Sequence, residues 1–172
     1  MKNKILPFLV IIIFGIIFFI LYKGLDDTKI YIPDINTKSE LPVFNTKDFF
    51  SRESVKSSSI FELNEIHLLN IWSSWCVPCR QEHSFLMNLK SDNKVNIIGM
   101  NYKDNRKNAE NFLKELGNPY KKIFTDLDGT IAIELGAYGV PESFLIYNNK
   151  IIKKYIGPLN QQLIDEINLL IK

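Results

Sequence analysis

Two cysteines set three positions apart constrain the fold more than any other feature of this 172-residue chain. They follow Leu68–Trp72, an almost uninterrupted apolar run that is typical of a strand buried on both faces of a parallel sheet. The residues after them repeat at steps of three and four, which predicts a helix from Val77 to Lys90. One face of this helix carries Cys79, Glu82, Leu86 and Leu89. The pattern therefore places Cys76 and Cys79 where a buried strand gives way to the first turn of a helix.

The rest of the chain alternates between strand and helix patterns. Strands are predicted at 95–100, 121–125, 143–147 and 150–156, and helices at 105–116, 131–135 and from about 161 to the end. The last two strands are expected to form a hairpin around the turn at Asn148 and Asn149. Two earlier segments, 41–50 and 58–66, are expected to pair as extended strands. The order predicts a three-layer α/β domain with helices on both faces of a mixed sheet.

An apolar run without charged residues, Ile5–Tyr22, precedes this domain. As a helix it reaches about 27 Å, near the lower limit for crossing a bilayer core of ~30 Å. We therefore expect a membrane anchor over 1–22, a polar tether over 23–39 and a folded domain over 40–172. The alternative is a cleaved secretory signal, but the run is longer than usual and no A-x-A-like cleavage site follows it.

The charge distribution argues against nucleic acid as a partner. The net charge is +2, from 21 Lys and Arg against 19 Asp and Glu. These charges are scattered along the chain, whereas proteins that bind phosphate backbones gather basic residues on one face.

The cysteine pair admits three interpretations: a metal ligand set, a structural staple or a redox centre. A structural zinc site needs four ligands, and His67 and His83 are the only histidines that could complete it. Their spacing does not require them to converge on the cysteines, and a hydrogen-bonded or surface role is favoured for both. A purely structural disulfide is also disfavoured, because closing so short a loop constrains the unfolded chain little.

The sequence "DLDG" at 126–129 favours a plain turn over a calcium-binding loop.

A redox dithiol explains the placement best. Unpaired N–H groups and partial positive charge at a helix N-terminus stabilise a thiolate on the first cysteine. Cys76 is thus predicted to be the exposed nucleophile, and Cys79 to attack the mixed disulfide that Cys76 forms. Pro78 fits the first helical turn, where its missing N–H costs nothing.

From about Leu41 to its C-terminus, the chain resembles the thioredoxin superfamily. More narrowly, it is similar to the membrane-anchored CcmG/DsbE proteins of cytochrome c maturation. The resemblance rests on "NIWSSWCVPCRQEH", "GMNYKDN", "FLKELGNPY", "DLDGTIAIELGAYGVPESFLI" and "IGPL". It implies a thioredoxin-like three-layer domain that follows one transmembrane helix. Residues 102–105 are expected to form a connecting loop, and Ser73 and Ser74 replace an alanine common among relatives.

The resemblance also implies an activity and partners. The protein is expected to be a thiol-disulfide oxidoreductase in the periplasm, anchored by a single pass in a bacterial inner membrane. Its redox-active disulfide is expected to need no other cofactor. It would reduce apocytochrome c or its maturation partners, with electrons from a membrane donor of the DsbD or CcdA type. Two alternatives stay open: an anchored TlpA/ResA-like reductase for other targets such as an oxidase copper site, or a haem or copper chaperone.

Carried over by position, the resemblance assigns site residues. Cys76 and Cys79 are the redox pair, and Pro141 is a cis-proline facing them, with the backbone of Val140 available to pair with an extended substrate. Tyr138 is part of the implied active-site surroundings. The expected substrate groove consists of Trp75, Val77, Pro78, Tyr138, Val140 and Pro141.

Glu82 and Glu142 are expected to tune the pair and carry protons. Asn70 stands where thioredoxins carry a buried aspartate and cannot ionise, so these glutamates are the available substitutes. A carboxylate near a thiol disfavours the thiolate. Because a dithiol with a less stabilised reduced form is a better reductant, we hypothesise that both glutamates make the pair donate electrons.

Overall fold

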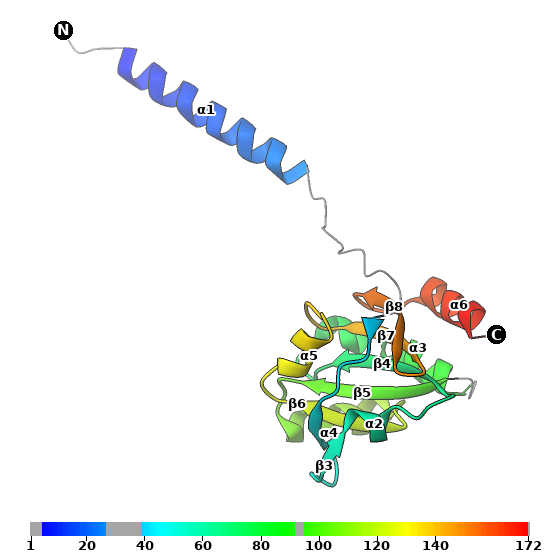
Figure 1. Ribbon diagram of the computed structural model, residues 1–172. Coiled ribbons are helices and arrows are strands. Elements are labelled where there is room, and N and C mark those ends of the chain that lie inside the picture. The colour runs from blue at the N-terminus through cyan, green and yellow to red at the C-terminus, as the bar shows by residue number, and fades with distance from the viewer. Residues whose placement is uncertain (1–4, 27–38, 92–94, 172) are drawn as a thin grey trace. The chain divides into compact units, whose positions relative to one another are not determined.

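The computed structural model of the protein describes residues 5–26, 39–91 and 95–171. The chain divides into two units, 1–34 and 35–172. The first contains the helix α1 (Ile5–Asp26) (Figure 1). Its side chains are described for residues 9–23 and are all exposed. Within the described residues, no helix combines the length and the apolar character needed to cross a membrane. Most of the expected tether, 27–38, lies outside the described residues.

The second unit is built on a mixed sheet, as predicted, and this sheet has eight strands. Its strands are β1 (Ser39–Glu40), β2 (Asn45–Asp48), β3 (Ser54–Lys56), β4 (Ile66–Trp72), β5 (Asn96–Tyr102), β6 (Lys122–Asp126), β7 (Glu142–Tyr147) and β8 (Lys150–Ile156). They lie in the order β1-β8-β7-β4-β5-β6-β2-β3 (Figure 1). β4 is central, parallel to β5 and antiparallel to β7. The segment that carries the cysteines therefore leaves the middle of the sheet.

Helices cover both faces of the sheet and create two apolar clusters. They are α2 (Ser57–Ile60), α3 (Val77–Ser91), α4 (Arg106–Leu116), α5 (Thr130–Glu134) and α6 (Gln161–Leu170). One cluster joins the sheet to α3, α4 and α6, and the other joins it to α2 and α5. Alternate residues of β4 divide between them: Leu68 and Trp72 face the first, and Leu69 and Ile71 face the second. Asn70 lies between Leu68 and Trp72 and so points towards α3.

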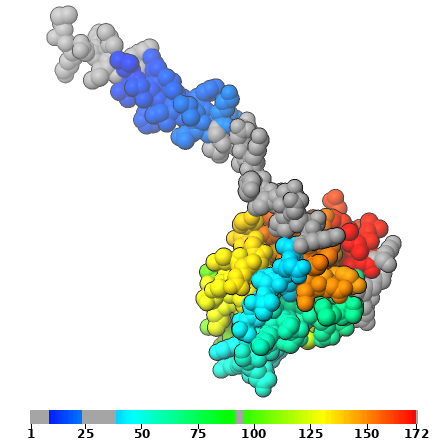
Figure 2. Space-filling view, viewed as in Figure 1, coloured from blue at the N-terminus to red at the C-terminus, as the bar shows by residue number. Residues whose placement is uncertain are grey.

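The N-terminal strands form a hairpin, but the second strand was predicted in the wrong place. β2 pairs with β3 at 54–56, whereas 57–60 form the short helix α2. Phe44 and Ser57 exchange hydrogen bonds, and Ile60 and Phe61 are buried in the second cluster. On the face shown in Figure 2, the segment near residue 40 (cyan) runs between the α5 region (yellow) and the β7–β8 hairpin (orange).

The C-terminal elements confirm the predicted hairpin and final helix. Asn148 and Asn149 have φ of 47° and 58°, the left-handed conformation that a two-residue hairpin turn requires. On α6, Ile164 and Ile167 are buried, whereas Leu170, the last residue of the helix, is 50% exposed.

Candidate active site

The two cysteines lie at the start of α3 and are joined by a disulfide bond. β4 ends at Trp72, and the chain turns so that Cys76 directly precedes the first helical residue, Val77. The N–H of Cys79 donates a 3.1 Å hydrogen bond to Sγ of Cys76. Cys76 thus occupies the capping position of a helix, where free N–H groups and partial positive charge favour a thiolate.

The prediction that Cys76 is exposed is wrong for the disulfide form. Cys76 is 4% exposed and Cys79 is 2% exposed, and both belong to the apolar cluster beneath α3. The reason is the bond itself, which ties the sulfur of Cys76 to a buried partner. The neighbouring Trp75, Val77 and Pro78 are exposed, so the surface around the pair is open to another molecule.

The predicted cis-proline is confirmed. The peptide bond between Val140 and Pro141 is cis, and Pro141 is buried at the start of β7. The carbonyl oxygen of Pro141 accepts a 3.1 Å hydrogen bond from the N–H of Gly157. Val140 is half-buried and packs against the apolar cluster that contains both cysteines.

Glu82 is a buried carboxyl group one turn beyond Cys79 on the same face of α3. It is 1% exposed, its Oε1 accepts a 2.8 Å hydrogen bond from Nδ2 of Asn70, and its Oε2 accepts one of 2.7 Å from the N–H of Leu159. Burial raises the pKa of Glu82 to about 7, against the lowering effect of the two hydrogen bonds. This group can therefore take up or release a proton near neutral pH.

Asn70 has a hydrogen-bonding partner on each side of its amide. Nδ2 donates to Glu82 and also to Oγ of Ser143 at 3.0 Å, and Oδ1 accepts a 2.8 Å hydrogen bond from the hydroxyl of Tyr120. Burial and the nearby Glu82 raise the pKa of Tyr120, which keeps its hydroxyl a donor. Tyr120 approaches closely because Gly99 has no side chain: a Cβ there would lie 2.9 Å from Cγ of Tyr120.

Glu142 is also buried, but it faces a cation. Its Oε1 accepts hydrogen bonds from the N–H groups of Tyr138 and Gly139, at 2.7 and 3.0 Å. Its Oε2 lies 2.8 Å from Nζ of Lys154 on β8, and the two side chains are 2% and 4% exposed. Lys154 was not among the predicted site residues, because "KIIKKYI" on its own does not indicate which lysine faces inward.

Two aromatic side chains of the predicted groove are exposed. Trp75 is 57% exposed, and its Nε1 donates a 3.1 Å hydrogen bond to the carbonyl oxygen of Lys103. Tyr138, near the cis-proline, is 64% exposed. A hollow of about 270 Å³ beside Trp75 is lined by residues of α3 and α4, including Arg80 and Phe112.

The loop after β5 holds the segment that leads to Cys76. Asp104 accepts hydrogen bonds from the N–H and Oγ of Ser74, at 2.6 and 2.7 Å, and from Nδ2 of Asn101 at 3.0 Å. Oγ of Ser73 donates to the carbonyl oxygen of Tyr102. The two serines, which replace an alanine common among relatives, thus join the redox segment to residues 102–104. The block "YKDN" in the family resemblance was the sequence signal that could have indicated this connection.

The histidines have the structural roles that were favoured. Nε2 of His67 lies 3.0 Å from the carbonyl oxygen of Glu62, and Nε2 of His83 lies 2.9 Å from that of Gly117. Across residues 5–26, 39–91 and 95–171, no group of three or more His, Cys, Asp or Glu could hold a metal ion. Asp126 of "DLDG" accepts hydrogen bonds from three backbone N–H groups at the start of α5, as a turn residue does.

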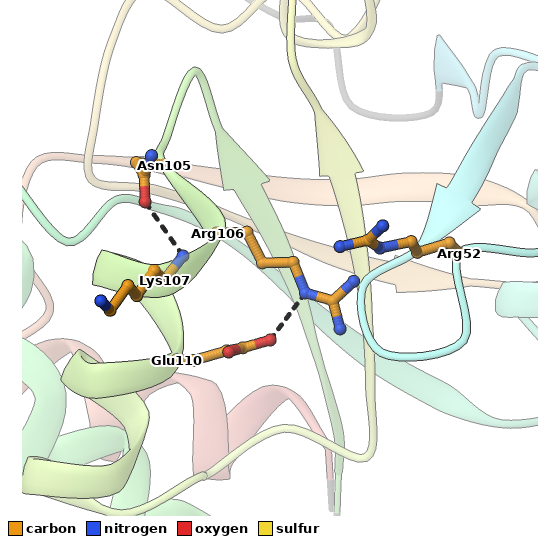
Figure 3. A pocket seen from close by; sticks show the side chains of 5 residues that line it. All are labelled: Arg52, Asn105, Arg106, Lys107 and Glu110. Carbon is orange, nitrogen blue, oxygen red and sulfur yellow. Dashed lines mark hydrogen bonds and ion pairs between the residues drawn. The ribbon is translucent and has the colours of Figure 1, made fainter.

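A second hollow, of about 420 Å³, lies at the N-terminus of α4 (Figure 3). It is lined by Arg52, Asn105, Arg106, Lys107 and Glu110. Oδ1 of Asn105 accepts the N–H of Lys107, and Nε of Arg106 lies 2.6 Å from Oε1 of Glu110. The N-terminus of α4 and the guanidinium group of Arg106 are thus already bound by groups of the protein itself.

Comparison with known proteins agrees with this geometry. A family model described as Redoxin matches residues 36–169. The chain is 38% identical over 140 residues to the thiol:disulfide interchange protein DsbE of Vibrio cholerae, a match covering 81% of this chain and 74% of that protein. It is 47% identical over 100 residues to DsbE of Escherichia coli, covering 58% of this chain but only 54%, about half, of that relative.

A solved structure shows the same fold. The crystal structure of a putative thiol:disulfide interchange protein DsbE from Chlorobium tepidum superposes with a TM-score of 0.64 at 25% identity. It covers 79% of this chain and 98% of the solved one. The fold is therefore thioredoxin-like, with the disulfide and the cis-proline in the expected elements. This chain belongs to the Redoxin family, and within that family to the DsbE thiol:disulfide interchange proteins.

Proposed function

We propose that this protein is a thiol-disulfide oxidoreductase that reduces disulfide bonds in other proteins. The observation that carries the proposal is the hydrogen bond from the N–H of Cys79 to Sγ of Cys76 at the N-terminus of α3. Such a donor stabilises negative charge on the first sulfur, which is the requirement for a nucleophilic thiolate. The exposed Trp75, Val77 and Tyr138 supply a contact surface for a protein partner.

The reaction transfers two electrons from the reduced pair to the target. The thiolate of Cys76 attacks one sulfur of the target disulfide, and the other target sulfur leaves as a thiolate. Cys79 then loses its proton and attacks Sγ of Cys76. This step forms the Cys76–Cys79 disulfide and releases the second target sulfur as a thiolate, so the target gains the two electrons that the pair loses.

Glu82 is the proton acceptor for Cys79 in this proposal. The two residues are buried on one face of α3, three positions apart. A carboxyl group with a pKa of about 7 can accept the proton of the Cys79 thiol near neutral pH. Its ionised form also disfavours a nearby thiolate, which makes the reduced pair a better electron donor. The positive charge of the Lys154 ammonium group offsets the negative charge of the Glu142 carboxylate, which was expected to act on the two cysteines.

The proposed targets are apocytochrome c, at its haem-attachment cysteines, or thiol proteins of its maturation. The proposed electron source is a membrane donor of the DsbD or CcdA type. Support comes from the relatives, which are named as thiol:disulfide interchange proteins, and from the sequence blocks shared with the cytochrome c maturation family. The groove of Val140 and Pro141 suits an extended target segment, because the backbone beside the cis-proline can pair with it.

The proposal also includes attachment to a bacterial inner membrane through residues 1–22, with the domain from residue 40 in the periplasm. Support comes from the absence of charged residues between Ile5 and Tyr22 and from the disulfide, which suits an oxidising compartment. Alkaline carbonate extraction tests the anchor. We expect the full chain to stay with the membranes and a variant lacking residues 1–22 to be soluble; a full chain released by carbonate would contradict the anchor.

A trapping experiment tests the central reaction. In a Cys79→Ser variant, Cys76 should accumulate a mixed disulfide with its target, identifiable by mass spectrometry. Cys76→Ser is the matched control and should trap nothing. A protein that traps no partner and instead binds haem or copper in a one-to-one ratio would be a chaperone, contrary to the proposal.

A further inference from the structure

Lys154 lies near one edge of the sheet, yet protein groups enclose its side chain almost completely. It lies on β8 opposite Phe144 of β7, and its side chain is only 4% exposed. Its Nζ donates a 2.7 Å hydrogen bond to the carbonyl oxygen of Gly136 and lies 2.8 Å from Oε2 of Glu142. The same Nζ lies 4.1 Å from the ring centroid of Tyr138. Cations are favourable at such a position over an aromatic face.

Glu142 completes these contacts from the other side of the loop. While Oε2 faces Lys154, Oε1 accepts the N–H groups of Tyr138 and Gly139. One buried ion pair therefore contacts residues 136, 138 and 139, which lead directly to the cis peptide bond between Val140 and Pro141. Removing one partner of a buried charge pair is costly. Here Nζ of Lys154 also donates to the carbonyl oxygen of Gly136 and Oε1 of Glu142 accepts two N–H groups, whereas Oε2 of Glu142 has only the ion-pair contact with Lys154.

We propose that Lys154 is a positioning residue for the partner polypeptide. By holding Glu142 and the loop 136–139, it fixes the Tyr138 ring and the Val140 backbone in the orientation that an extended partner segment contacts. The inference rests on the proposed function and deepens it, because it assigns recognition of the partner to a lysine that touches neither the sulfur atoms nor the partner. Tyr138 is suited to this role, since Lys154 lies over its ring while 64% of the residue is exposed.

This role differs from electrostatic tuning of the cysteines. The opposite charges of Lys154 and Glu142 lie 2.8 Å apart and largely cancel at a distance. Loss of the loop contacts should therefore weaken recognition of a peptide without changing the intrinsic chemistry of the thiols. A small disulfide with no peptide backbone does not need the loop, whereas a peptide disulfide does.

The test compares two oxidised probes in single-turnover reactions with the reduced full-length protein. One probe is a synthetic peptide with an internal Cys-x-x-Cys-His disulfide, and the other is 2-hydroxyethyl disulfide. For Lys154→Met we expect the half-saturating peptide concentration to rise about tenfold or more, while the rate with 2-hydroxyethyl disulfide changes far less. Lys154→Arg should recover most of the peptide affinity. The matched control is Lys153→Met, a half-exposed lysine on the same strand that pairs with Glu166.

The outcomes separate the inference from the proposed function. If wild-type reduces the peptide and Lys154→Met does so with unchanged half-saturation, the positioning role is overturned. A shifted reduction potential in the double variant Glu142→Gln with Lys154→Met, which removes both charges, or an equal loss with both probes in Lys154→Met, would instead mean that the pair tunes the sulfur atoms, and would also overturn it. If wild-type reacts only with the small disulfide, the proposed function fails together with the inference.

A second variant keeps the test informative should Lys154→Met not fold. The double change Glu142→Gln with Lys154→Met removes both charges at once and leaves no unpaired buried charge. It should fold, lose peptide affinity and keep the small-disulfide rate. Unchanged peptide affinity in this folded double variant would overturn the inference.

Discussion

Nδ2 of Asn70 donates a 2.8 Å hydrogen bond to Oε1 of Glu82, so a neutral amide faces this buried carboxyl group. Glu142, by contrast, faces the ammonium group of Lys154 at 2.8 Å. Glu82 and Glu142 were both predicted to tune the cysteine pair, but their surroundings differ. Burial raises the pKa of Glu82 to about 7, whereas Glu142 is part of an ion pair.

Glu82→Gln should remove a pH dependence of folding stability. Because the folded protein holds the Glu82 proton more tightly than the unfolded chain does, the contribution of Glu82 to the free energy of unfolding falls between about pH 4.5 and 7 and is level above that. A pKa raised from 4.5 to about 7 corresponds to a loss of about 3 kcal/mol. Urea unfolding of the oxidised protein across this range should show this contribution as a difference in slope between wild-type and Glu82→Gln, whereas the exposed control Glu115→Gln should have the wild-type slope. An identical slope in all three proteins would show that Glu82 has an ordinary pKa.

Tyr120→Phe should raise the pKa of Glu82 further. The Tyr120 hydroxyl holds Oδ1 of Asn70, which leaves Nδ2 to face the carboxyl group. Without the hydroxyl, the amide can turn its oxygen towards Glu82 and accept the proton of the neutral acid, which stabilises that form. The measurement is a titration of the Glu82 carboxyl carbon by NMR in both proteins. A lowered or unchanged pKa would refute the orienting role of Tyr120. At a pH where Glu82 is ionised, Oδ1 of Asn70 is left unpaired, which should also cost about 1–3 kcal/mol of stability.

Gly99→Ala should destabilise the domain, because the absence of a side chain at Gly99 leaves room for the Tyr120 ring to reach Asn70. A Cβ there would lie 2.9 Å from Cγ of Tyr120 and 3.0 Å from Nε1 of Trp72. Two stacked aromatic rings in a packed core cannot move aside freely, so we expect a loss of about 1–3 kcal/mol in urea unfolding. Gly139→Ala is the control, since nothing lies within 4 Å of a Cβ at that position. Equal stability of Gly99→Ala and wild-type would show that this part of the core can relax.

Asp104→Ala should loosen the segment before Cys76. The Asp104 carboxylate accepts the N–H of Ser74 and the Ser74 hydroxyl, so its removal frees both donors. Hydrogen exchange at the Ser74 amide should become at least about tenfold faster, equivalent to about 1.4 kcal/mol of lost protection. Exchange within α6, far along the chain, serves as the internal reference. Retained protection at Ser74 would mean that other contacts fix this segment.

Much of the fold could be predicted because local patterns and packing agree. The apolar run of β4, the three-and-four spacing of α3 and the Asn148–Asn149 turn all lie in the predicted elements. β3 and α2 could not be placed, because both are short and depend on contacts such as the Phe44–Ser57 pair rather than on their own sequence.

The parts of the site that lie in sequence motifs were predicted, whereas the contacts that form only when the chain packs were not. The cysteine pair and the cis-proline follow from "CVPC" and "GVPE". Tyr120 and Lys154 come from distant strands and loops, and only the sheet brings them to Asn70 and Glu142. The exposure of Cys76 was mispredicted because this residue is bonded to the buried Cys79 and packs in the same apolar cluster.

The reduction potential of the Cys76–Cys79 pair tests the account most directly. At pH 8, where Glu82 is largely ionised, its charge should disfavour the thiolate form and make wild-type a stronger reductant. The potential of Glu82→Gln, measured by equilibration with a glutathione buffer, should therefore be more positive by about 30 mV or more, equivalent to about 1.4 kcal/mol. Glu115→Gln should match wild-type. A Glu82→Gln potential that is unchanged or more negative would contradict the claim that this buried carboxylate directs electrons from the pair to its target.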